Sequence, residues 1–283
     1  MKSSRAANDV LAVLKKNSLA GRIVIGTALA LAVAAIILYA KLEILILLVV
    51  IWVSLATVEF VNLLRIAEIN LNLWLLIFLN LTIVLAAYLK LQPHFLIAPI
   101  GIIFLWATTQ RQPLPRIPVY SLFTIIYLGF LPSHLVLIRS TVQEKHFSPW
   151  LTLFPFVLTW LNDTAAYALG KLFGKHKLAP VLSPNKTVEG FLAGTVFSAI
   201  LGGLWLPKMA PFSCYPVGIA VLLGAVLGAI AHAGDLFESL FKRAVGTKDS
   251  STILGAHGGF LDRIDSLLFT IPAFYYILRL FLR

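Results

Sequence analysis

Long apolar segments follow one another along almost the whole chain and leave little sequence for a soluble domain. A helix that crosses a bilayer needs about 20 predominantly apolar residues. Nine segments approach this length: 23–40, 43–64, 73–90, 94–108, 118–138, 149–169, 188–206, 215–234 and 264–282. The sequence therefore predicts an all-α polytopic membrane protein with about nine transmembrane helices.

The composition supports the same class. Hydrophobic residues make up 59% of the chain and charged residues only 12%, whereas a soluble domain has about 25% charged residues. The first apolar segment is longer than a typical signal-peptide core and a second follows at once, so we expect a retained membrane anchor. The one cysteine, Cys214, excludes an internal disulfide and a metal site built from several cysteines.

The basic residues predict an orientation. Lysine and arginine concentrate in the cytoplasmic loops of membrane proteins. With the N-terminus inside, the internal segments hold 16 of the 23 basic residues. This bias predicts a cytoplasmic N-terminus in the cytoplasmic (inner) membrane, with loops 170–187 and 235–263 both in the cytoplasm. It also explains the net charge of +11 without a nucleic-acid partner; an anionic substrate or lipid headgroup is a second explanation.

The acidic residues divide the chain. Seven of the twelve lie between residues 163 and 265, several of them near predicted helix ends, where a buried carboxylate is costly. We therefore expect an N-terminal anchor region over 1–148 with about five transmembrane helices. Residues 149–283 would form a catalytic region with about four helices and two cytoplasmic loops.

The first polar cluster surrounds the predicted helix that follows Ser183 and Pro184. Lys186 and Thr187 would lie near its N-terminus, where backbone N–H groups and a lysine suit a phosphate group. Helix capping by Ser183 and Thr187, and a surface pair between Lys186 and Glu189, are simpler explanations. Close backbone approach upstream would be allowed by Gly170 and Gly174.

The second cluster is denser. If residues 232–243 are helical, Asp235, Glu238 and Lys242 share one face, and Asp262 and Asp265 share another at the start of the last helix. Converging carboxylates suit Mg²⁺, which also binds waters and substrate phosphates. Asp235 and Asp262 are the strongest metal candidates. The alternative is a network of ion pairs: Glu238 with Lys242, Lys248 with Asp249, and Asp262 with Arg263.

Two further features are ambiguous. His257 precedes a flexible Gly258-Gly259 turn, and we expect it to contact phosphate or stabilise the turn. It is not needed as a base, because a phosphate monoester with a second pKa of about 6 is already mostly a dianion near pH 7. Glu59 and Asn80, in apolar segments, would line a cavity or, more simply, form hydrogen bonds between helices.

These clusters carry a recognisable pattern. The upstream runs are Asp163-Thr164-x-Ala166-Tyr167 and Ser183-Pro184-x-Lys186-Thr187-x-Glu189-Gly190. The downstream run is Ser239-x-x-Lys242-Arg243-x4-Lys248-Asp249-x7-His257-Gly258-Gly259-x-x-Asp262-Arg263-x-Asp265. Their order resembles the phosphatidate cytidylyltransferase (CDP-diacylglycerol synthase) family. Residues 1–150 match it only in hydrophobicity, and Gly255-Ala256 stands where the family usually has Pro-Gly.

The resemblance implies transfer of a cytidylyl group from CTP to phosphatidic acid or a similar lipid phosphate, with membrane lipids as surroundings. It implies Mg²⁺ held by Asp235 and Asp262; a second cation and a homodimer stay open. Catalytic roles would fall to Asp235, Lys248, Asp249, Asp262 and Asp265. Substrate binding would fall to Asp163, Ser183, Lys186, Thr187, Glu189, Lys242, Arg243, His257, Gly258, Gly259 and Arg263.

Three alternatives compete with this function. A lipid kinase or another CDP-lipid synthase would also use CTP at the membrane. An ion-coupled transporter would place its carboxylates near the midplane of the bilayer, whereas most carboxylates here fall in loops and at helix ends. A non-catalytic scaffold derived from the enzyme would not need the complete set of carboxylates.

Overall fold

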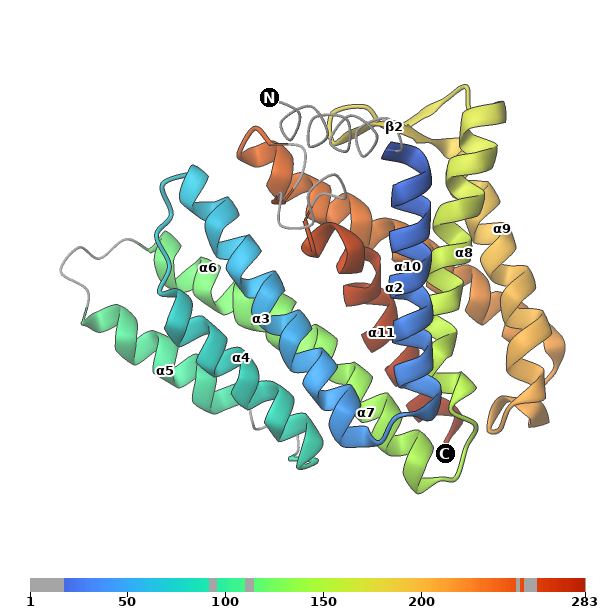
Figure 1. Ribbon diagram of the computed structural model, residues 1–283, viewed down its shortest axis with the longest axis horizontal. Helices are drawn as coiled ribbons and strands as arrows, with labels where there is room; N and C mark the ends of the chain where they lie inside the picture. Colours follow the sequence, from blue (N-terminus) through green and yellow to red (C-terminus); the bar gives the residue numbers. More distant parts are fainter. Residues whose placement is uncertain (1–17, 92–95, 110–114, 248–249, 252–258, 283) are drawn as a thin grey trace, which may run out of the picture.

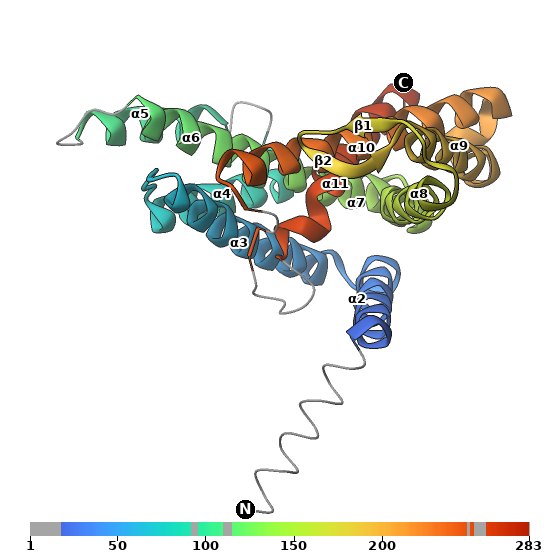
Figure 2. The same cartoon turned by 90° about the horizontal axis from the view of Figure 1, so that it is seen from above.

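The computed structural model describes residues 18–91, 96–109, 115–247, 250–251 and 259–282. These residues form a bundle of helices with one short hairpin of strands (Figure 1, Figure 2). Each of the nine predicted apolar segments corresponds to a helix or a continuous helical run. In chain order the elements are α2 (Ser18–Tyr39), α3 (Leu42–Ile66), α4 (Leu73–Tyr88), α5 (Ile97–Thr108), α6 (Arg116–Thr124), the π-helix η2 (Ile125–Phe130), α7 (Leu131–Glu144), α8 (Trp150–Phe173), β1 (Lys177–Ala179), β2 (Ser183–Thr187), α9 (Val188–Trp205), the 3₁₀ turns η3 (Leu206–Lys208) and η4 (Phe212–Cys214), α10 (Val217–Ala244) and α11 (Leu261–Phe281).

The bundle has the helix lengths of a multi-pass membrane protein. Among the described residues, five helical runs are long and apolar enough to cross a bilayer: Leu42–Ile66, Arg116–Glu144, Val188–Lys208, Val217–Ala244 and Leu261–Phe281. Helices α4 and α5 are apolar but shorter. The hairpin and the beginning of α2 lie at one end of the bundle, and α11 ends at the other (Figure 1).

The hairpin corrects one expectation of the sequence. Ser183-Pro184 does not lead directly into a helix; residues Ser183–Thr187 form β2, which pairs antiparallel with β1. Proline biases the residue before it toward extended backbone, and the helix begins only at Val188. Thr187 is the cap of α9: its hydroxyl accepts a hydrogen bond from the backbone N–H of Gly190 at 3.1 Å.

Small residues let α8, α9 and α10 approach closely. A Cβ atom added at Gly224 of α10 would overlap the backbone carbonyl oxygen of Ser198 and lie 3.0 Å from the Cα atom of Gly202, both in α9. Close backbone approach at small residues is a common way for membrane helices to associate. This contact fixes α10, which carries Asp235, against the helix that follows β2.

An aromatic cluster joins the two halves of the chain. Phe60 of α3, Phe123 of α6 and Tyr127 of η2 pack around Phe241 of α10, with ring centroids 4.9 to 6.4 Å from the Phe241 ring. Phe237, one turn earlier in α10, joins the same cluster. The first half of the chain therefore supports the helix that carries the second polar cluster.

Candidate active site

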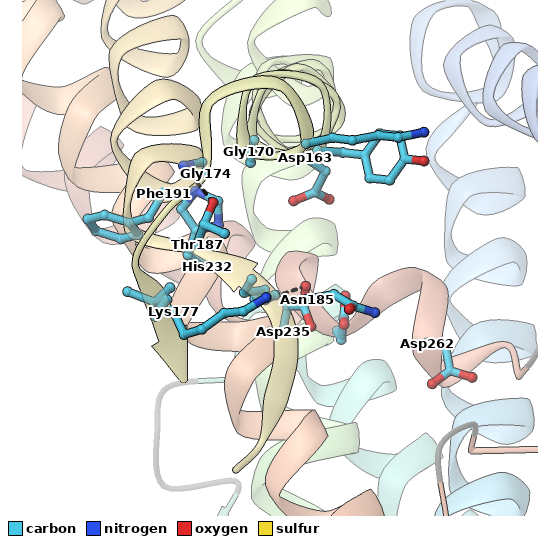
Figure 3. Close-up of a pocket in the computed structure, with 17 residues that line it drawn as sticks. Asp163, Gly170, Gly174, Lys177, Asn185, Thr187, Phe191, His232, Asp235 and Asp262 are labelled. Atoms are coloured by element: carbon cyan, nitrogen blue, oxygen red, sulfur yellow. Dashed lines mark hydrogen bonds and ion pairs between the residues drawn. The ribbon is translucent and has the colours of Figure 1, made fainter. Parts of the chain in front are cut away.

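A cavity of about 710 Å³ lies beside the hairpin, among α8, α9, α10 and α11 (Figure 3). Small-molecule sites usually occupy about 300–1,000 Å³, so this cavity is large enough for a nucleotide-sized ligand. Lysines from α8 and the hairpin line it together with aspartates from the helices. Its charged lining residues are Asp163, Lys171, Lys177, Lys186, Asp235, Asp262 and Asp265.

The aspartates come from three helices. Asp163 lies on α8, Asp235 on α10, and Asp262 and Asp265 on α11. In Figure 3 Asp163 points from α8 toward the region of Asp235, and Asp262 lies farther along the cavity. Gly234 makes this arrangement possible, because a Cβ atom there would lie 2.8 Å from the carbonyl oxygen of Asp265. The four carboxylates that were expected to converge therefore line one cavity.

Lys186 forms an ion pair across the cavity wall. Its Nζ atom lies 2.5 Å from Oδ2 of Asp235, and both side chains are partly buried. A pair in this position is screened less than a surface pair. Lys186 does not form the simpler surface pair with Glu189 that was the alternative explanation. Glu189 instead accepts hydrogen bonds from the backbone N–H groups of Lys175 and His176, and it contacts the Nδ1 atom of His176 at 2.6 Å.

Glycines pack tightly around Thr187 at the back of the cavity. A Cβ atom at Gly170 would lie 2.9 Å from the Thr187 hydroxyl oxygen, and one at Gly174 would lie 2.7 Å from the same oxygen. Gly190 is similarly close to α8, because its Cβ atom would lie 2.7 Å from the carbonyl oxygen of Ala166. The expected role of Gly170 and Gly174 in close backbone approach is therefore confirmed.

Several residues predicted to bind substrate hold the hairpin instead of lining the cavity. Arg243 donates from Nε to the carbonyl oxygen of Leu182 at 3.0 Å and from Nη1 to that of Thr247 at 3.2 Å. Ser183 pairs with Ala179 in the ladder. With Glu189, these residues hold the hairpin that carries Lys186, and their direct contact with substrate stays a prediction.

Lys242 lies behind the cavity between two carboxylates. Its Nζ atom is 2.6 Å from Oε2 of Glu238 and 2.6 Å from Oδ1 of Asp262. The pair with Glu238 is the one that the ion-pair alternative predicted, whereas Asp262 pairs with Lys242 in place of the expected Arg263. Because its charge is already neutralised, Lys242 acts here as a support for Asp262.

Asp262 is also held by backbone donors. Its Oδ2 atom accepts hydrogen bonds from the N–H of Gly259 at 2.8 Å and from the N–H and hydroxyl of Ser250 at 3.1 Å each.

The remaining predicted site residues do not line the cavity or lie outside the described residues. Arg263, which follows Asp262, is exposed. Four residues of the predicted site lie outside the described residues: Lys248, Asp249, His257 and Gly258.

The donor set fits Mg²⁺ shared with a substrate. Mg²⁺ is usually bound by one or two carboxylates together with waters and substrate phosphates. The cavity is lined by four aspartates, yet the described part of the chain has no group of three or more histidine, cysteine or acidic side chains arranged to hold a metal alone. Four aspartates face three lysines here, so a polyanion would need an added cation to bind beside the carboxylates.

Comparisons with known proteins identify the family of this chain. The model of the cytidylyltransferase family matches residues 20–281. The chain belongs to this family. It is 39% identical over 179 residues to a phosphatidate cytidylyltransferase of Aquifex aeolicus (strain VF5), covering 63% of this chain and 64% of that protein. It is 46% identical over 155 residues to one of Staphylococcus aureus (strain COL), covering 54% and 56%. The chain thus aligns with little more than half to two thirds of these relatives.

Two contributors to the site were missed or underrated in the sequence. Asn185 of β2 lines the cavity, and no spacing or charge pattern distinguished it. Glu59 of α3 is bonded to the start of α11, where Asp262 lies. The signal for Glu59 was present, because an acidic residue within an apolar helix is rare and usually has a specific partner.

Proposed function

We propose that this protein transfers a cytidylyl group from CTP to phosphatidic acid, giving CDP-diacylglycerol and pyrophosphate. The observation that carries the proposal is the cavity at one end of the helix bundle, where Asp163, Asp235, Asp262 and Asp265 meet lysines of α8 and the hairpin. Family membership and the activity for which the aligned relatives are named support it.

The reaction would need little covalent chemistry from the protein. A phosphate oxygen of the lipid would attack the α-phosphorus of CTP, forming a new P–O bond while the bond to the β-phosphate oxygen breaks and pyrophosphate leaves. Lys171, Lys177 and Lys186 would bind and neutralise phosphate oxygens. The ion pair with Asp235 would hold Lys186 in place, and correct positioning of the two substrates would supply much of the rate enhancement.

Asp235 and Asp262 would hold Mg²⁺, and Asp265 would remain close by as a further oxygen donor. When bound, the ion would supply charge neutralisation for the phosphate oxygens of nucleophile and leaving group. Lys248, Asp249, His257 and Gly258 belong to the same proposal through the family resemblance.

We also propose that the chain crosses the membrane nine times with the N-terminus in the cytoplasm, as the distribution of basic residues predicts. The hairpin and the start of α11 would then face the compartment that contains CTP. The lipid would keep its acyl chains in the bilayer while its headgroup enters the cavity. Residues 1–148 would serve as an anchor region, and residues 149–283 would contain the catalytic residues.

Purified protein in detergent, given CTP, Mg²⁺ and a panel of lipid phosphates, would test the proposal. Label from the α-phosphate of CTP should enter the lipid with phosphatidic acid, and chelation of divalent cations should stop it. Label from the γ-phosphate should stay out of the lipid; its appearance there would identify a lipid kinase. Transfer of the α-label to a different lipid phosphate alone would leave a CDP-lipid synthase but refute phosphatidic acid as the substrate.

A further inference from the structure

Glu59 is a fully buried carboxylate near the C-terminal end of α3. A carboxylate in apolar surroundings is strongly disfavoured unless hydrogen bonds replace its lost hydration. Its partners belong to the other half of the chain. Oε1 accepts a hydrogen bond from the N–H of Phe260 at 2.8 Å, and Oε2 accepts one from the N–H of Leu261 at 2.7 Å.

These two N–H groups are the first two at the N-terminus of α11. The first N–H groups of a helix have no partner within the helix and carry a positive partial charge. A local side chain usually caps them, yet Phe260 occupies the cap position and makes no side-chain capping bond. Glu59 therefore supplies from α3 the cap that the local sequence of α11 lacks.

The same carboxylate holds the polar segment before the helix. The hydroxyl of Ser251 donates to Oε1 of Glu59, and the hydroxyl of Ser250 lies 3.3 Å from Oε2. Ser250 is also bonded to Asp262, through its N–H and its hydroxyl, each 3.1 Å from Oδ2. Ser250 thus links Glu59 directly to the aspartate that faces the cavity.

Gly259, Ser250 and the Glu59 carboxylate are tightly packed against one another. A Cβ atom at Gly259 would overlap the hydroxyl oxygen of Ser250 and lie 2.9 Å from Oε2 of Glu59. Any shift of the Glu59 carboxylate would therefore move Ser250, Gly259 or the start of α11, and each of these contacts Asp262 or carries it.

We propose that Glu59 is a positioning residue, which from α3 holds residues 250–251 and the N-terminus of α11 so that Asp262 faces the cavity. It would not touch substrate, since it is enclosed by its four donors. Its effect on catalysis rests on the function proposed above; its effect on the start of α11 does not.

Three variants separate this role from general stability. Glu59→Gln keeps the shape, but its NH₂ group replaces one acceptor oxygen, so the backbone N–H and the serine hydroxyl that donate to that oxygen lose their acceptor. Glu59→Asp keeps the charge on a shorter side chain. Glu43→Gln is the matched control, because Glu43 is an exposed acidic residue in the first turn of the same helix.

Amide hydrogen exchange tests the positioning without any activity measurement. In Glu59→Gln the amide of Phe260 or of Leu261, whichever faces the new NH₂ group, should exchange at least about tenfold faster than in the wild type, whereas peptides from the second half of α11 should be unchanged. Glu43→Gln should match the wild type throughout. Unchanged exchange at Phe260 and Leu261 in Glu59→Gln would overturn the inference.

Kinetics test the consequence for catalysis. Glu59→Gln should lower kcat by about 10²-fold, the scale expected when a reacting group is misplaced by about 1 Å, and the Mg²⁺ concentration for half-maximal rate should rise. Loss of folded protein would lower the rate but leave that concentration unchanged. Glu59→Asp should restore part of the rate. Wild-type kinetics in Glu59→Gln would refute the catalytic role, whereas a wild type inactive with every lipid would refute only the proposed function.

Discussion

Asp235 and Asp262 line one cavity but are held in different ways. Among the described residues, Asp235 forms one ion pair, with Lys186. Asp262 accepts from Lys242, Gly259 and Ser250 and so connects three parts of the chain. The proposed function requires both carboxylates, and we expect Asp262, which has more hydrogen-bond donors, to contribute more to the stability of the fold.

Asparagine substitutions should separate these two contributions. Asp235→Asn and Asp262→Asn should both abolish CTP- and Mg²⁺-dependent formation of the CDP-lipid, because each removes a carboxylate from the cavity. Asp262→Asn should also lower the free energy of unfolding by about 2 kcal/mol, since it weakens a charged hydrogen bond with a buried lysine. Both variants should stay folded at room temperature, as checked by thermal denaturation in detergent. Full activity of Asp262→Asn would disprove its metal-binding role.

The sequence predicted the positions of some site residues but not of others. The spacing of Asp262 and Asp265 on one helix predicted that both would face one site, and both line the cavity. No spacing could connect Glu59 with Phe260, because 201 residues separate them. Nor could the pattern tell that Arg243 would bind the hairpin backbone, since a surface arginine suits phosphate equally well.

At the scale of elements, the site depends on how closely α9 and α10 cross. Gly224→Ala would push a methyl group into the backbone of α9 at Ser198 and should lower the free energy of unfolding by about 1–3 kcal/mol. Gly218→Ala is the control in the same helix, because nothing lies within 4 Å of a Cβ atom there. The midpoint of thermal unfolding should fall for the first variant alone, and equal midpoints would show that the crossing is not tightly packed.

The helices were predictable and the hairpin was not. Apolar length alone identifies a membrane helix, because the bilayer demands that backbone groups be satisfied within the segment. Strands β1 and β2 are three and five residues long, too short for a periodic pattern to appear. Their pairing depends on tertiary contacts, among them the hydrogen bonds that the backbone N–H groups of Lys175 and His176 donate to Glu189.

At the scale of the whole molecule, the two halves of the chain form one packed structure around the cavity. The aromatic cluster fixes α3 against α10 through Phe60 and Phe241, and Glu59, adjacent to Phe60, reaches α11. From its sequence the first half was expected to match the family only in hydrophobicity, but the family model covers residues 20–281. The sequence marked Glu59 as unusual, and the structure was needed to identify its partners. An anchor that also positions catalytic groups would tolerate little change along this face of α3.

The overall orientation can be tested with the one native cysteine. Cys214 is exposed, in the connection between α9 and α10, and the predicted topology puts it outside the cell. A membrane-impermeant maleimide should therefore label it in intact spheroplasts. Val181 is 84% exposed beside the hairpin strands, so Val181→Cys in a Cys214→Ser background should be labelled only after the membrane is opened.

The two positions flank α9, so the pair of results constrains the site as well as the orientation. Labelling of both from outside would mean that α9 does not cross the bilayer, despite its length and hydropathy. The reverse pattern would leave α9 as a crossing helix but put Lys186 and the start of α11 on the side without CTP. Because a CTP-dependent enzyme needs its cavity on the cytoplasmic side, that outcome would contradict the proposed function together with the topology.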